Sequence, residues 1–164
     1  MAPKVGIVMG SDSDLPVLEK CAQTLKEFGV EYEITVMSAH RTPERATQYA
    51  RTARTRGLRV IIAGAGMAAH LAGALAAQCV LPIIGVPLDA SPLKGMDALL
   101  ATVQMPPGIP VATVAIGAPG AKNAALLAVQ ILATSDDDLY KKLENHRLNL
   151  EQEVLKKAKA VEGI

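Results

Sequence analysis

The segment "MSAHRTPERA", residues 37–46, carries the side chains best suited to chemistry. His40 stands two residues after Ser38 and directly before Arg41. A histidine can gain and lose a proton near neutral pH, and an arginine can hold a phosphate with two parallel N–H groups. A single histidine in a loop is also typical of an exposed or capping residue, so the segment alone leaves both readings of His40 open.

A second polar segment, "GSDSD" at residues 10–14, combines hydroxyl and carboxylate side chains with a helix start. Ser11, Ser13 and the backbone amides there could receive a phosphate, and Asp14 could accept hydrogen bonds from ribose hydroxyls. The alternative is an ordinary helix cap by serine or aspartate. The segment lacks the spacing of a P-loop and of the three-glycine dinucleotide fingerprint, so a nucleoside triphosphate site is not supported.

The third segment is "GAGMAAH", residues 64–70. Gly64 and Gly66 would let the backbone approach a flat ligand closely, and His70 follows about one turn later. On a helix of small residues, His70 is more typical of a hydrogen-bonded core histidine than of a catalyst. With three histidines in the chain and no clustered carboxylates, no metal site is expected.

Alternating strands and helices must position these segments. Periodicity predicts five strands, from Lys4 to Met9, from Glu31 to Met37, over 58–66, over 81–88 and from Val111 to Ala115. It also predicts five helices between and after them, from Ser13 or Asp14 to Phe28, from Pro43 to Thr55, over 68–79, from Leu93 to Thr102 and over 117–133. This order predicts an α/β fold: a flavodoxin-like three-layer sandwich with a five-stranded parallel sheet. The loops after the first three strands should then meet at one crevice.

The chain ends in one long predicted helix, from Asp136 to Val161, within a single domain that spans residues 1–164. An apolar stripe runs along it, made of Leu139, Leu143, Leu150, Val154 and Ala158. Such a helix, at residues 135–164, can extend past its own domain, and we expect it to pack partly on a neighbouring subunit. Docking on its own sheet fits the pattern equally well.

Composition excludes several classes of protein. With 50% hydrophobic residues, 20% charged residues and a net charge of +1, the chain matches a packed soluble protein and not a nucleic-acid-binding one. One Phe, three Tyr and no Trp leave little for a flavin sandwich. Residues 60–88 are apolar, but His70, Gln78 and Pro82 interrupt a transmembrane reading. Two distant cysteines and a start without signal-peptide features suggest the cytoplasm.

Five segments in order resemble one family, the class I N5-carboxyaminoimidazole ribonucleotide mutases of purine biosynthesis. They are "GIVMGSDSD" (6–14), "SAHRTPERA" (38–46), "IIAGAGMAAHLAG" (61–73), "VQMPPGIPVATVAIG" (103–117) and "AKNAALLAVQILA" (121–133). The resemblance covers nearly the whole chain. It implies a flavodoxin-like sandwich assembled as an octamer, and an enzyme that uses no ATP, metal or organic cofactor.

The implied reaction moves a carboxyl group within one ribonucleotide, from the exocyclic nitrogen of an aminoimidazole to ring carbon 4. By this resemblance His40 is the proton carrier. Residues expected to bind the substrate or to line its site are Ser11, Ser13, Asp14, Ser38, Arg41, Gly64, Gly66 and His70. The Gly64 to Gly66 loop and "QMPPG" (104–108) would form the enclosing walls.

The chain departs from the family pattern at a few positions. Met67 and Ala72 replace a glycine and a proline of the usual "GGAAHLPG", and His146 stands where an aromatic residue is common. Two other functions remain open: a class II carboxylase that adds free carbon dioxide to aminoimidazole ribonucleotide, and a non-catalytic nucleotide-binding module.

Overall fold

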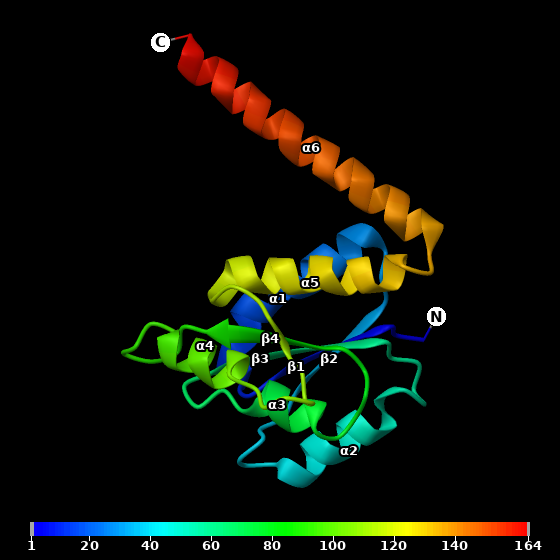
Figure 1. Ribbon diagram of the computed structural model, residues 1–164, viewed down its shortest axis with the longest axis vertical. Helices are drawn as coiled ribbons and strands as arrows, with labels where there is room; N and C mark the ends of the chain where they lie inside the picture. Colours follow the sequence, from blue (N-terminus) through cyan, green and yellow to red (C-terminus); the bar gives the residue numbers. More distant parts are fainter. Residues whose placement is uncertain (1, 164) are drawn as a thin grey trace.

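The computed structural model describes residues 2–163 and is built around one parallel sheet (Figure 1). Its strands lie in the order β2-β1-β3-β4-β5. Their bounds are Val5–Met9 for β1, Tyr32–Val36 for β2, Val60–Gly66 for β3, Ile83–Leu88 for β4 and Ala112–Thr113 for β5. All neighbouring strands pair in parallel, as expected for apolar strands that are joined by helices.

The order of the strands determines where a ligand can bind. After β1 the chain adds β2 on one side, and it then crosses to add β3 on the other side of β1. The connections that follow β1 and β3 therefore run in opposite directions along the sheet, and a crevice opens between them at the carboxyl ends of these strands. Met9, the last residue of β1, pairs with both Val36 and Gly64, so the three loops leave the sheet side by side.

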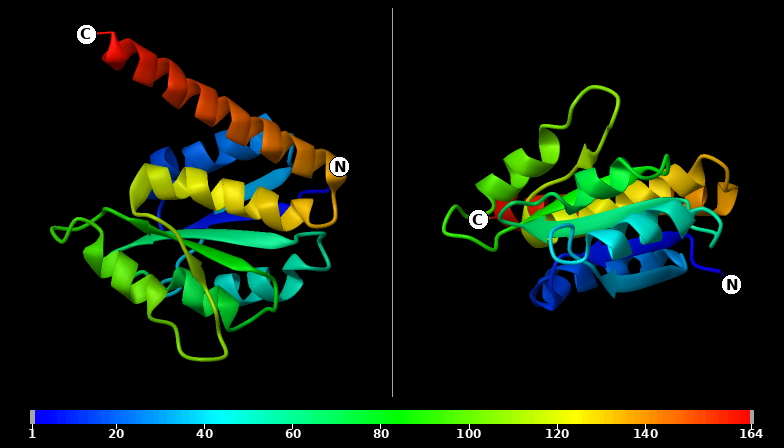
Figure 2. Two further views of the ribbon diagram at one scale, coloured as in Figure 1. Left: turned by 45° about the horizontal axis from the view of Figure 1, so that its top comes forward. Right: turned by 90° about the horizontal axis from the view of Figure 1, so that it is seen from below.

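Two helical layers cover the sheet. The helices α1 (Leu15–Phe28) and α5 (Gly117–Ala133) pack together on one face, and α2 (Pro43–Ala53), α3 (Leu71–Ala76) and α4 (Met96–Val103) lie on the other, as Figures 1 and 2 show. Each layer encloses its own apolar core. The predicted three-layer α/β sandwich with five parallel strands is therefore confirmed.

Three local predictions differ from the structure. The strand predicted over 58–66 does reach Gly66, because Gly64 and Gly66 pair with β4, so the expected Gly64 to Gly66 loop is the end of β3. The helix predicted over 68–79 is shorter, with α3 limited to Leu71–Ala76. The first helix is preceded by a 3₁₀ turn, η1 (Asp12–Asp14), because Ser11 and Asp14 cap each other's backbone there.

The C-terminal helix α6 (Asp137–Glu162) leaves the body of the domain (Figures 1 and 2). Its start is held by the Asp136 carboxylate, which accepts the Leu139 N–H at 3.1 Å, and by Lys142 Nζ, which donates to the Phe28 carbonyl at 2.8 Å. Leu139 is its one buried residue, whereas Leu150 and Val154 are 45% and 64% exposed. The distal apolar stripe thus has no partner within residues 2–163.

The apolar segment at residues 60–88 forms β3, α3 and β4 inside the domain. Among the helices of residues 2–163, none combines the length and the apolar character that crossing a bilayer requires.

Candidate active site

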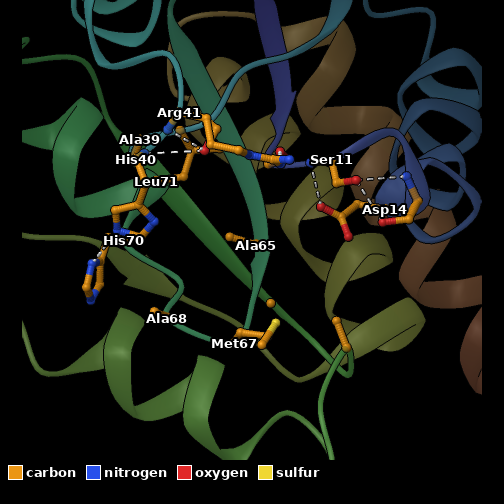
Figure 3. A pocket seen from close by; sticks show the side chains of 15 residues that line it. Ser11, Asp14, Ala39, His40, Arg41, Ala65, Met67, Ala68, His70 and Leu71 are labelled. Atoms are coloured by element: carbon orange, nitrogen blue, oxygen red, sulfur yellow. Dashed lines mark hydrogen bonds between the residues drawn. The ribbon is translucent and has the colours of Figure 1, made fainter.

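A cavity of about 520 Å³ opens at the carboxyl ends of β1, β2 and β3 (Figure 3). It is lined by Gly10, Ser11, Ser13, Asp14, Ser38, Ala39, His40, Arg41, Ala65, Gly66, Met67, Ala68, His70, Leu71 and Ala90. Eight of the nine site residues expected from the sequence thus gather in one place, and Gly64 is the exception. The three sequence segments meet where the strand order predicts.

The loop after β2 is folded by Ser38. Its Oγ accepts the backbone N–H groups of His40 at 3.3 Å and of Arg41 at 3.1 Å. The Thr42 hydroxyl closes the loop from the other side, accepting the Ser38 N–H at 2.9 Å and donating to the Ser38 carbonyl at 3.1 Å. An extended segment would have turned His40 and Arg41 to opposite sides, but this turn lets both side chains line the cavity.

Arg41 reaches across the top of the cavity toward the β1 loop (Figure 3). One terminal nitrogen donates to the Gly10 carbonyl at 2.9 Å. Within residues 2–163 the guanidinium has no carboxylate within ion-pair distance, since the ion pairs there join Lys4 to Asp136 and Arg56 to Glu33. Its charge and remaining N–H groups are therefore available to an anionic ligand.

His40 and His70 face each other at one side of the cavity (Figure 3). His40 Nε2 lies 2.9 Å from His70 Nδ1, and the rings meet edge to face with centroids 4.9 Å apart. One of these two nitrogens must carry the hydrogen and the other must accept it. The prediction of a core position for His70 is wrong: the residue precedes α3 as its N-cap and is exposed, because the helix begins only at Leu71.

The "GSDSD" segment forms the opposite side of the cavity. Ser11 Oγ accepts the Ser13 N–H at 3.3 Å and the Ser13 hydroxyl at 2.9 Å, and Asp14 Oδ2 accepts the Ser11 N–H at 3.0 Å. The capping reading of these residues is thus correct, but the same side chains also line the cavity. The same residues therefore cap the helix and line the cavity.

Asp14 is the buried acid of the site, with 8% of its surface exposed. Burial raises the pKa of its carboxyl, and the Asp12 charge adds to this. The N–H groups of Ser11 and Gly10 and the charge of Arg41 act in the opposite direction. Within residues 2–163 the hydrogen bond to this carboxyl group is to Oδ2, so Oδ1 is suited to accept one from a neutral hydroxyl group of a ligand.

The two glycines of β3 serve different purposes. A Cβ at Gly66 would lie 2.5 Å from the Cβ of Ala90, so only glycine fits at this cavity wall. Gly64 does not line the cavity: a Cβ there would lie 2.8 Å from Leu18 Cδ2, on the packed side of the sheet. Gly64 therefore lets α1 approach β3, which the sequence pattern could not separate from ligand contact.

Met67 follows directly in a left-handed conformation, with φ of 54°. A non-glycine residue pays about 1–2 kcal/mol for this backbone geometry. Met67 nevertheless lines the cavity and is 58% exposed as a residue, while Ala72, the second departure, is buried away from it.

One residue that lines the cavity was not predicted from the sequence, and one segment that was predicted to enclose the site does not line it in this chain. Ala90, just after β4, lines the cavity, and its position at the carboxyl end of a parallel strand was the available signal. The "QMPPG" segment, residues 104–108, is not among the lining residues of this chain. Within residues 2–163, no three His, Cys, Asp or Glu side chains gather as metal ligands would.

Comparison with known proteins agrees with this fold. The AIR carboxylase family matches residues 4–153, and the chain belongs to that family. It is 58% identical over 160 residues to the N5-carboxyaminoimidazole ribonucleotide mutase of Pyrococcus horikoshii, which covers 98% of this chain and 89% of the relative. A crystal structure of a PurE2 variant from Treponema denticola superposes with a TM-score of 0.86 at 30% identity, covering 96% of both chains.

A longer relative carries a different name. The phosphoribosylaminoimidazole carboxylase of Saccharomyces cerevisiae is 54% identical over 162 residues, which is 99% of this chain but 28% of the yeast protein. The same fold is thus found both as a separate chain and as part of a larger one.

Proposed function

We propose that this enzyme converts N5-carboxyaminoimidazole ribonucleotide to 4-carboxy-5-aminoimidazole ribonucleotide, as the name of its relatives indicates, in the synthesis of purine nucleotides. The observation that carries the proposal is the single cavity in which a histidine pair faces an unpaired arginine and a buried aspartate. A phosphate, a ribose and an exchangeable proton each have a matching group there.

The two sides of the cavity divide the ligand between them. Arg41 and the hydroxyl groups of Ser11 and Ser13 would hold the phosphate, because they supply a charge and several hydrogen-bond donors within one region. Asp14 would accept hydrogen bonds from the ribose hydroxyls. The aminoimidazole would then lie toward His40, which occupies the other side of the cavity (Figure 3).

His40 would carry one proton between two positions of the substrate. When the bond between nitrogen and the carboxyl carbon breaks, carbon dioxide leaves and the nitrogen takes a proton from His40. Ring carbon 4 then forms its bond to carbon dioxide, and the proton lost from that carbon returns to His40. The proton is returned at the end, so His40 is regenerated in each turnover. Because the substrate already carries the carboxyl group, the shift itself consumes no ATP. Holding carbon dioxide beside carbon 4 makes the second step a reaction between fixed neighbours.

The names of the relatives matched over most of their length favour the mutase over the carboxylase. Relatives named as mutases match this chain over most of their own length, 89% in Pyrococcus horikoshii and 96% in Bacillus subtilis. The yeast relative named as a carboxylase is more than three times longer, so its name describes a protein with additional parts. A non-catalytic nucleotide-binding module would have no use for the histidine pair.

Assembly and location follow as part of the proposal. We propose that the enzyme is a homo-oligomer in the cytoplasm. Substitutions in the distal half of α6 test the assembly. Exposed leucine and valine side chains on a helix that leaves its own domain support contact with other subunits, and an octamer is the assembly implied by the family resemblance.

One assay tests the proposed function. The purified protein is given either the carbamate ribonucleotide or aminoimidazole ribonucleotide with bicarbonate, without ATP, and absorbance of the carboxylated product is followed. Efficient conversion of the carbamate alone is expected. Conversion of only the second mixture would identify a carboxylase, and tight nucleotide binding without conversion would identify a binding module.

A further inference from the structure

Met67 has a left-handed backbone conformation, which glycine adopts more readily than methionine. Its φ of 54° suits glycine, yet the chain keeps a long apolar side chain there. The turn is fixed on both sides, since Gly66 has no room for a Cβ beside Ala90 and the Ala69 N–H donates to the Met67 carbonyl at 2.9 Å. Strain that is retained at a cavity wall indicates a use for the side chain.

The surroundings of Met67 indicate what that use is. Figure 3 shows its side chain on the opposite side of the cavity from Arg41, beyond Ala65 and beside Ala68. The neighbouring walls, Ala65, Ala68 and Ala90, offer no polar side-chain atoms, so the charged and hydrogen-bonding groups lie elsewhere in the cavity. This end of the cavity suits a small guest without charge or hydrogen-bond donors.

We infer that the Met67 side chain retains carbon dioxide between the two half-reactions by covering this apolar end of the cavity. The inference rests on the proposed function. Carbon dioxide has no net charge and no donor, so apolar contacts and exclusion of water hold it better than Arg41 does. A methionine suits the task because its flexible, polarisable side chain can follow the surface of a changing ligand.

The bond changes define what is lost without this cover. Once the bond between nitrogen and carbon has broken, carbon dioxide either forms its bond to carbon 4 or leaves the cavity and is hydrated to bicarbonate. In the second case the nitrogen keeps its proton and aminoimidazole ribonucleotide is released. The ratio of aminoimidazole ribonucleotide to carboxylated product therefore measures retention directly.

The test compares this ratio in variants of the full chain under single-turnover conditions, with 13C in the carbamate, unlabelled bicarbonate in the solution and an enzyme-free blank. Met67→Gly should raise the ratio about fivefold, as expected from loss of ~1 kcal/mol of apolar contact, and should lower the 13C content of the product. Met67→Gln keeps the length of the side chain but not its apolar character, and it should raise the ratio similarly. Met67→Leu should raise it least.

Lys94→Gly is the matched control, because Lys94 is the other non-glycine residue with positive φ in residues 2–163, at 52°, and does not line the cavity. It should relieve similar strain and leave the ratio unchanged. A wild-type ratio in both Met67→Gly and Met67→Gln would overturn the inference while leaving the mutase reaction intact. If the wild-type protein itself forms no carboxylated product, the proposed function fails instead.

Discussion

Replacing Arg41 tests whether the cavity binds a phosphate in the way that its charges suggest. Arg41 lines the cavity and uses one nitrogen on the Gly10 carbonyl, so its other N–H groups are free for a ligand. Hydrogen bonds to a charged partner contribute about 1.5–3 kcal/mol each. Loss of one such bond in Arg41→Lys and of two in Arg41→Ala predicts KM increases of at least about tenfold and a hundredfold.

The assay is a substrate titration that separates KM from kcat, with Arg45→Ala as the control. Arg45 lies four residues away and binds the Val36 carbonyl at 3.2 Å and the Thr35 hydroxyl at 3.0 Å on the edge strand, outside the cavity. The Arg45 variant should keep the wild-type KM. Equal KM values for Arg41→Ala and wild type would refute phosphate binding by Arg41, and equal losses for both variants would indicate a structural effect.

Three further predictions concern stability and assembly. Burial raises the pKa of Asp14 above its ordinary value of 3.8, so the folded state holds that proton more tightly and loses stability as pH rises through the raised pKa. Asp14→Asn should therefore raise Tm relative to wild type more at pH 7 than at pH 4, and an equal difference at both would contradict it. In α6, Leu139→Ala should destabilise the fold by about 2–5 kcal/mol in urea unfolding, because Leu139 is buried. Leu150→Ala combined with Val154→Ala should instead lower the molar mass by light scattering, and an unchanged mass would count against subunit contact through that stripe.

The sequence predicted the sheet and the crevice because both depend on patterns that the chain repeats. The apolar strands and the helices between them fix a parallel sheet, and the crevice follows from where its strand order reverses. Ser11, Asp14, His40 and Arg41 could be placed there because each follows a predicted strand. The exit of α6 was one of two alternatives, since an apolar stripe does not say which surface covers it.

The details that escaped prediction depend on contacts between distant segments. The role of Gly64 is decided by Leu18, and that of Gly66 by Ala90, neither of which is near in the sequence. The pairing of His70 with His40 likewise joins residues thirty positions apart. Periodicity placed His70 within a helix, but the helix begins one residue later and leaves the ring exposed.

The most direct test of the account is the rate of the His40→Asn variant with the carbamate ribonucleotide, measured beside His70→Asn. The two rings touch each other and both are exposed, so each substitution should leave the fold intact. The account predicts that His40→Asn lowers kcat by about a hundred- to ten-thousand-fold with nucleotide binding retained, and that His70→Asn has a smaller effect. A rate near that of wild type for His40→Asn would contradict His40 as the proton carrier.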